Sequence, residues 1–322
     1  MTRKMLAVVL GATRGQGGSV VNALLKTGQY SIRGVTHDAN TPEARRLQER
    51  GVEVVAADLD DPSSLDAAFA SAHVIFAVTT MYDGDVEREV AQGKKVADSA
   101  AAVDMLQHFI WSTLPSASAI SDGKIPVPHM DGKAQVDEYI LNALPALAQK
   151  TTFYWGGFYA ENVTYPPYAP NCLSSAGNYV WVQPVASDTL VPMVGDHNVN
   201  TGIFIRAILE KAHLCLPRGY VLGVADWVVH GDMLEAWATI LSEKNGETMD
   251  VVYVHSDVET VGQIWPGTGR ELGQMLKLSE KLGRDAWTKK DTTALTMQDL
   301  GLEVGDRDGK LGKGFEYVQM LR

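Results

Sequence analysis

The sequence has few cysteines, no sustained basic run and no long apolar run. Cys172 and Cys215 are too few for a disulfide framework in 322 residues, which favours a reducing compartment. A net charge of -11 argues against a surface that binds nucleic acid directly. No apolar stretch approaches the roughly 20 residues of a membrane-spanning helix. These absences predict a cytoplasmic protein without membrane contact.

The stretch from Met5 to Val21 organises the chain. An apolar run leads into the glycine-rich sequence GATRGQGG, and apolar residues at helical spacing follow it. Backbone amides at a helix N-terminus bind phosphate, and glycines let it approach closely. Strand, loop and helix in this order predict a dinucleotide site, with an ordinary tight turn as the alternative. The predicted loop contacts are Gly11, Thr13, Arg14, Gly15, Gln16 and Gly17.

Strands and helices are predicted to alternate through residue 155. The expected strands are 5–10, 31–36, 52–57, 74–78, 108–111 and 151–155, and the expected helices are 17–27, 42–50, 63–70, 85–103 and 131–144. Short connections between them indicate an α/β fold with a doubly wound, parallel, Rossmann-type sheet. We therefore assign residues 1–155 to an NAD(P)-binding Rossmann domain.

Residues 156–322 form a smaller, less regular region, which we interpret as a substrate-binding part packed on the sheet. Helices are expected at 200–211, 227–241 and 271–282, with a strand at 251–254 and a short helix near Thr296. Nine aromatic residues between Phe153 and Trp181 fit a cleft wall for a planar or apolar ligand. Core packing is the alternative for those inside a strand. Phe158, Tyr159 and Asn162, which follow the strand, are better ligand candidates.

Residues after the strands indicate the cofactor. NAD enzymes place an acidic residue after the second strand, whereas Thr36 and His37 stand there and Asp38 comes late. Arg14 and Arg33 could pair with a 2′-phosphate, which favours NADP(H). Further cofactor contacts are expected from residues after the third, fourth and fifth strands: Asp58, Leu59, Val78, Thr79 and Thr113. Asp58 could accept from adenine or cap the next helix.

Six short stretches then occur in a characteristic order: residues 11–19, 51–59, 63–65, 76–79, 129–133 and 157–162. Together they resemble the NmrA-like family of atypical short-chain dehydrogenase/reductases, strongly over the first half of the chain and loosely over the second. The resemblance implies a Rossmann fold and preferential NADP binding. It also implies two kinds of member: reductases that use NADPH, and redox-sensing regulators that bind nucleotide and a partner protein. His37 stands where the family usually has Arg, and Arg14 where it has Gly.

The candidate catalytic residues are Lys133, His129 and Tyr159. Tyrosine-dependent short-chain enzymes place Tyr and Lys four residues apart on one helix face, but His129 occupies the tyrosine position here. Lys133 matches the lysine that NmrA-like reductases keep, which implies contact with the ribose and nicotinamide and a second role as proton donor; a solvated lysine is the alternative. His129 could replace tyrosine as the acid, or cap or pack. The histidine spacing gives no reason to expect a metal.

The leading hypothesis is an NADPH-dependent reductase of a small, aromatic or apolar carbonyl, imine or activated C–O or C=C compound. The alternative is an NADP-sensing regulator without turnover that binds a partner such as a transcription factor and works in the nucleus. A non-redox isomerase or lyase is a third reading. Both a protein partner and a homodimer remain open.

Overall fold

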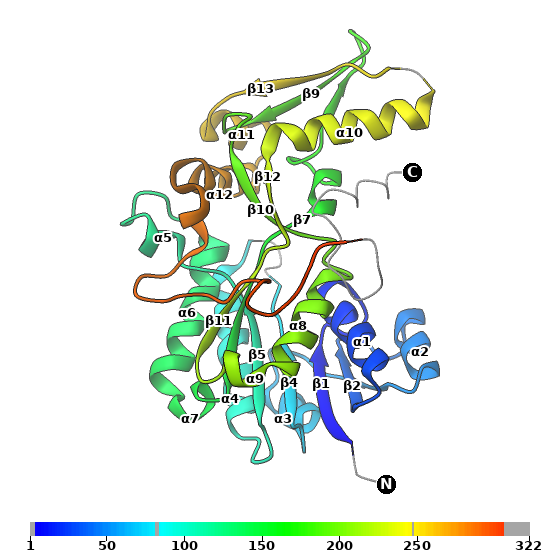
Figure 1. The fold of residues 1–322 in the computed structure, drawn as a ribbon, viewed down its shortest axis with the longest axis vertical. Coiled ribbons are helices and arrows are strands. Elements are labelled where there is room, and N and C mark those ends of the chain that lie inside the picture. Colours follow the sequence, from blue (N-terminus) through cyan, green and yellow to red (C-terminus); the bar gives the residue numbers. More distant parts are fainter. Residues whose placement is uncertain (1–3, 81–83, 247, 306–322) are drawn as a thin grey trace.

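The computed structural model describes residues 4–80, 84–246 and 248–305. A seven-stranded sheet with the order β11-β6-β5-β4-β1-β2-β3 forms its centre (Figure 1). Neighbouring strands in this sheet are parallel throughout. The strands are β1 Met5–Leu10, β2 Tyr30–Thr36, β3 Glu53–Ala56, β4 Val74–Ala77, β5 His108–Thr113, β6 Thr151–Gly156 and β11 Gly219–Gly223. The predicted doubly wound α/β sheet is confirmed.

Helices cover both faces of this sheet. The helices up to residue 215 are α1 Gly15–Thr27, α2 Pro42–Glu49, α3 Pro62–Phe69, α4 Val86–Ala101, α5 Ala117–Ile120, α6 Pro128–Ala143, α7 Pro145–Ala148, α8 Asn200–Glu210 and α9 Ala212–Cys215. Alternate residues of a strand face opposite sides, so Val8 and Leu10 pack in one apolar cluster while Ala7 and Val9 pack in another. The first cluster includes side chains of α3, α4 and α6, and the second includes side chains of α1, α2 and α8.

Several helix ends follow their local sequence. Thr41 and Asp61 each accept from a backbone N–H of the following helix, and each precedes a proline. Helix α1 ends at Gly28, which adopts the left-handed conformation. The helix expected from residue 131 begins at Pro128, and Asp131 lies in its first turn. None of the described helices combines the length and apolarity needed to cross a bilayer.

The second half adds two small sheets and more helices, drawn mostly in the upper part of Figure 1. One sheet joins β7 Phe158–Tyr159, β10 Leu190–Gly195 and β12 Asp226–Val229; the other joins β8 Asn171–Leu173, β9 Asn178–Gln183 and β13 Val251–His255. The helical segments are η1 Ala160–Thr164, α10 His230–Asn245, α11 Val258–Ile264, α12 Gly269–Leu282 and η2 Gly283–Trp287. Strand β11 and helix α8, although they come from this half, belong to the main sheet and its layers.

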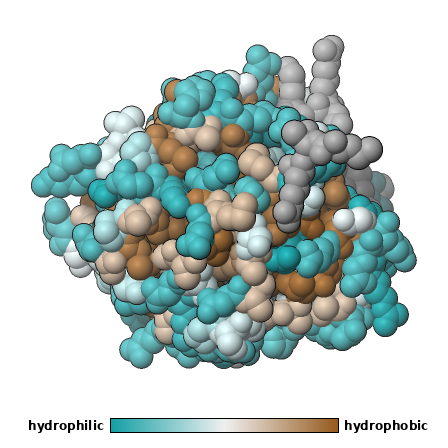
Figure 2. All heavy atoms as spheres, turned by 90° about the horizontal axis from the view of Figure 1, so that it is seen from below, coloured by the Kyte–Doolittle hydropathy of each residue, from teal (hydrophilic) through white to brown (hydrophobic). Residues whose placement is uncertain are grey.

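Two local predictions are wrong. The helix expected from residue 227 begins at His230, because the preceding residues Asp226–Val229 pair with β10. No helix forms near Thr296, where the chain makes a turn in which Asp299 accepts from the backbone and hydroxyl of Thr296. The first error arises where tertiary pairing overrides the local pattern, and the second where a local side-chain bond closes a turn. Seen from below, hydrophilic side chains spread over most of the surface, with apolar atoms between them (Figure 2).

His230, the first residue of α10, is a fully buried imidazole. Its Nδ1 lies 3.0 Å from the Tyr253 hydroxyl, which itself donates to the Val185 carbonyl at 2.8 Å. The imidazole is therefore the donor in the bond to Tyr253, and its buried Nε2 has no partner among the described groups. Burial lowers the pKa of His230 to about 3. The folded protein thus keeps this histidine neutral.

We expect acid to destabilise the protein through His230. An unfolded histidine titrates near 6.5, so the unfolded chain binds the proton before the folded chain does. The free energy of unfolding therefore decreases as the pH is lowered from about 6.5 to about 3. The loss at pH 5 relative to pH 7 should be about 2 kcal/mol from this residue. In urea unfolding at the two pH values, His230→Asn, whose amide can still donate to Tyr253, should lose less than wild type. The exposed His213→Asn serves as control, and equal losses in all three proteins would contradict the assignment.

Candidate functional site

A cavity of about 960 Å³ lies beyond the carboxyl ends of the parallel strands. In the sheet, β1 lies between β2 and β4, so the chain connections run toward opposite edges of the sheet from this point. Open α/β sheets bind ligands where the strand order reverses in this way. The cavity brings together every predicted site residue except Arg33. They are Gly11, Thr13, Arg14, Gly15, Gln16, Gly17, His37, Asp58, Leu59, Val78, Thr79, Thr113, His129, Lys133, Phe158, Tyr159 and Asn162.

The loop after β1 has the shape of a phosphate cradle. Gly11 and Gly15 adopt positive φ angles of 64° and 55°. A Cβ on Gly17 would lie 2.2 Å from the Leu10 carbonyl oxygen, so only glycine permits this closeness of α1 to β1. Arg14 occupies the N-cap of α1 without a side-chain hydrogen bond to the first turn. The Arg14 side chain thus does not occupy the backbone N–H groups of that turn, which can donate to a ligand. This end of the helix carries the positive end of its dipole and favours an anion.

After β2 the cavity is lined by Thr36 and His37 and not by the carboxylate of Asp38. Asp38 accepts from the Asn40 backbone at 2.8 Å and does not line the cavity, whereas His37 and Arg14 do. Asp58 lines it and accepts from the Asp60 backbone at 2.9 Å. Helix α3 is capped by Asp61, so capping is not the role of Asp58.

Arg33 is excluded from this site by its position. It lies in the middle of β2, away from the carboxyl edge of the sheet. Its guanidinium donates to the Ala68 and Ala70 carbonyl oxygens at 2.9 Å and pairs with Glu53 at 3.0 Å. Arg33 therefore lies outside the cavity in which it was predicted to contact the cofactor.

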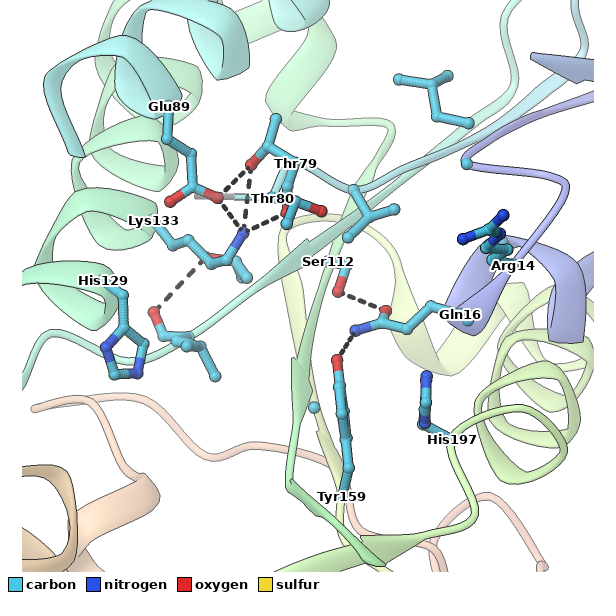
Figure 3. Close-up of a pocket in the computed structure, with 18 of the residues that line it drawn as sticks. Arg14, Gln16, Thr79, Thr80, Glu89, Ser112, His129, Lys133, Tyr159 and His197 are labelled. Carbon is cyan, nitrogen blue, oxygen red and sulfur yellow. Dashed lines mark hydrogen bonds and ion pairs between the residues drawn. The ribbon is translucent and has the colours of Figure 1, made fainter. Parts of the chain in front are cut away.

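Lys133 is held by groups from two other elements (Figure 3). Its Nζ donates to Glu89 Oε1 at 2.9 Å and to the Thr79 carbonyl and hydroxyl oxygens at 3.0 and 3.2 Å. The side chain of Lys133 is 14% exposed and that of Glu89 is 3% exposed. Lys133 is therefore no solvated surface lysine, and Glu89, which sequence reasoning did not find, is its buried counter-ion.

His129 is paired with a second carboxylate that sequence reasoning missed. Glu271, in the first turn of α12, accepts from the His129 backbone N–H at 2.7 Å, and the same oxygen lies 2.8 Å from Nδ1. Burial alone would raise the pKa of Glu271, but its hydrogen bonds with His129 and the charge of the imidazole outweigh burial and lower it. Apolar side chains border this end of the cavity: Leu114, Phe158, Leu272, Met275 and Trp287.

Tyr159 lies on the opposite side of the cavity, in a chain of polar side chains (Figure 3). Gln16 donates to its hydroxyl at 2.6 Å and accepts from Ser112 at 2.7 Å. The ring of Tyr159 stacks on that of His197, with centroids 4.2 Å apart. Burial raises the pKa of Tyr159. The phenol therefore stays protonated, without the neighbouring lysine that activates tyrosine in related enzymes.

His197 also belongs to a group that the sequence spacing did not reveal. Its Nδ1 contacts a carboxylate oxygen of Glu161, and Asp196 completes a set whose potential ligand atoms lie within 4.8 Å of one another. Asn198 donates to Glu161 at 3.1 Å and, through its backbone, to Asp196 at 2.8 Å. Each of the three side chains thus has at least one protein contact, and we assign no metal to them.

A family model accounts for nearly all of the described chain. The model of the NmrA-like family matches residues 3–298. The chain belongs to the NmrA-like family. The NmrA-like family domain-containing oxidoreductase hkm9 of Aspergillus hancockii is 32% identical over 171 residues, which are 51% of this chain and 50% of that protein. The match thus spans about half the length of such curated relatives.

Solved structures agree with the NmrA-like fold. NmrA, a negative transcriptional regulator crystallised in complex with NADP, superposes with a TM-score of 0.70 at 20% identity, covering 99% of this chain and 95% of that one. The NADPH-dependent quinone oxidoreductase QOR2 from Escherichia coli, complexed with NADPH, gives 0.68 at 18% identity, covering 98% and 99%. At these identities the likeness concerns the fold.

The two adjacent glycines of α1 provide a matched test of the phosphate loop. We expect Gly17→Ala to cost about 2–3 kcal/mol in unfolding free energy, because its Cβ meets backbone oxygen at 2.2 Å. Gly18→Ala should be neutral or stabilising, because its Cβ would lie 3.4 Å from the nearest atom and alanine favours the helix. Urea unfolding of both variants measures the difference. Equal effects would show that the closeness of α1 to β1 does not matter.

The Lys133–Glu89 pair should show strong coupling in a double-mutant cycle. Glu89→Gln leaves a buried ammonium without its counter-ion, which should cost about 3 kcal/mol, whereas adding Lys133→Met should restore much of the loss. The exposed Glu259–Arg270 pair, with both side chains 61% exposed, should show less than about 1 kcal/mol of coupling. Additive effects at Lys133 and Glu89 in urea unfolding would contradict the pairing.

Proposed function

We propose that this protein is an NADPH-dependent reductase of small apolar or aromatic compounds with a carbonyl, imine or activated C–O or C=C group. The observation that carries the proposal is one continuous cavity that runs from the glycine loop to an apolar chamber containing Lys133 and His129. Its volume of about 960 Å³ suits a dinucleotide together with a small substrate. NADP and NADPH in the crystallised NmrA and QOR2 support the choice of cofactor.

The residues of the loop fit the cofactor. The amides after Gly15 would hold the diphosphate, since a side chain at Gly17 would collide with the strand below. Arg14 and His37 line the end where a 2′-phosphate would lie, and Asp38 is occupied elsewhere. Lys133, fixed beyond β4 by Thr79, would orient the ribose and nicotinamide. NADPH, when bound, supplies the hydride.

The substrate chamber is built by both halves of the chain. Leu114 follows β5, while Leu272, Met275 and Trp287 come from the α12 and η2 region. Such walls favour a neutral, apolar or aromatic molecule and keep water from the reacting carbon. A polar group of the substrate would meet His129 at this end of the cavity. Nδ1 of its ring is bonded to Glu271, which leaves Nε2 for the substrate.

A regulator without turnover is the less supported function. The relative at 32% identity is named an oxidoreductase, whereas the regulator NmrA shares 20% identity and its likeness concerns the fold. We therefore keep the reductase as the proposal.

The cofactor proposal predicts tight and selective binding. By calorimetry, NADPH should bind at least tenfold more tightly than NADH, and Arg14→Ala should remove most of that difference, because a charged contact to phosphate contributes about 1.5–3 kcal/mol. Arg45→Ala, an exposed arginine of α2 outside the cavity, is the matched control. With NADPH present, a panel of aromatic aldehydes, ketones, quinones and cyclic imines should include acceptors that consume its absorbance. A folded protein that binds neither nucleotide, or binds NADPH and reduces nothing in the panel, would argue against the reductase.

A further inference from the structure

Reduction of a carbonyl needs a proton as well as a hydride, and Lys133 is poorly placed to give one. Its ammonium has three protons, and three acceptors surround it: Glu89 Oε1 and the two oxygens of Thr79 (Figure 3). Loss of a proton from Lys133 would leave the buried carboxylate of Glu89 beside a neutral amine. The network therefore fixes the position of the Lys133 ammonium and occupies each of its protons.

His129 lies in a different arrangement. It is the second residue of α6, and Glu271 reaches it from α12, which is 142 residues away in the sequence. The positive end of the α6 dipole and the backbone N–H of His129 both favour an ionised carboxylate at this place. An ionised Glu271 can only accept, so Nδ1 carries a proton and donates it. Carboxylate and imidazole are thus oriented as in enzymes that use histidine as an acid–base group.

The other ring nitrogen, Nε2, is the atom that remains for chemistry. Within the described part of the chain no group forms a hydrogen bond with Nε2. Nε2 is also not one of the fully buried polar atoms that lack a partner, so a ligand can reach it. The side chains of His129 and Glu271 are each 17% exposed and both line the cavity. We propose that His129, positioned by Glu271, protonates the reduced substrate through Nε2, and that Lys133 donates no proton. This inference rests on the proposed reductase function and identifies the acid within its site.

The step balances with one hydride and one proton. The hydride adds to the carbonyl carbon and breaks the carbon–oxygen π bond. The electron pair released onto oxygen takes the proton from Nε2 of the imidazolium. His129 is left neutral, with the proton on Nδ1 still donated in the hydrogen bond to Glu271, and a proton from the solvent then returns to Nε2. An imine nitrogen would take the same proton in place of oxygen.

Several charged groups lie near the imidazole, and the carboxylate of Glu271 is the one in direct contact with it. The positive end of the α6 dipole lies at the same place. The charge of Lys133, one turn further along α6, is compensated by Glu89 of α4. Asp131 is engaged by Ser116 and Ser118. Burial and then the charge of Glu271 raise the pKa of Tyr168, which stays a neutral phenol.

The test compares pH profiles of three variants with NADPH and 4-nitrobenzaldehyde, or the best acceptor of the panel. Glu271→Gln keeps an oxygen for the His129 backbone but removes the charge. This variant should lower kcat at least tenfold at pH 7.5 and leave KM nearly unchanged. The decline of kcat at high pH should begin about one pH unit lower than in wild type. His129→Asn should lose the decline altogether and at least a hundredfold in kcat. Lys133→Met should raise KM for NADPH and leave the decline at its wild-type pH.

A second readout does not depend on turnover. In ¹⁵N NMR of histidine-labelled protein without nucleotide, Glu271→Gln should lower the titration midpoint of His129, whereas the surface control Glu259→Gln should not. An unchanged midpoint and pH profile in Glu271→Gln, or a decline abolished by Lys133→Met, would overturn the inference. Failure of the reductase function would give a different result. The wild-type protein would then oxidise no NADPH with any acceptor, although the titration of His129 would still change in Glu271→Gln, and both proposals would be wrong.

Discussion

The close approach of α1 to its neighbours is the constraint on which the rest of the molecule depends. Gly17 brings the helix against the Leu10 carbonyl, and a Cβ on Gly202 of α8 would lie 2.2 Å from the Ser19 carbonyl. The Gly202 backbone also donates to the Ser19 hydroxyl at 2.8 Å. Helix α1 is thus held between β1 and α8. The first contact aims the loop amides into the cavity, and the second fixes the C-terminal half on the same helix.

The parallel sheet could be predicted because its signals are local. Most of its strands are short apolar runs, and several connections are marked by a cap, a proline or a glycine, as at Thr41, Asp61 and Gly28. In the second half such marks do not separate every strand from the element that follows it. Asp226–Val229 runs directly into a helical pattern, and only its pairing with β10 makes it a strand. Pairing partners that distant cannot be read from a single stretch of sequence.

The candidate site divides in the same way. Thr79, Thr113 and Asp58 could be predicted because residues after parallel strands must meet at one edge of the sheet. Glu89 and Glu271 could not, because an acidic residue within a helix is typical of a solvated face. Arg33 shows the converse: its charge suggested a phosphate contact, but the carbonyls of Ala68 and Ala70 take its hydrogen bonds. Which charge is buried depends on the packing of remote elements.

The two ion pairs of the cavity are unexpected if stability alone is considered. A buried pair such as Lys133–Glu89 adds little to folding, because desolvation offsets the attraction. Yet α6 presents His129 and Lys133 to the same cavity four residues apart, on one helix face. Their carboxylates come from different helices, α4 and α12. Lys133 is thus immobilised within the first half, whereas His129 receives its carboxylate from the second half. The chemistry proposed for His129 therefore requires α12 in place, which gives the less regular half a role beyond covering the substrate.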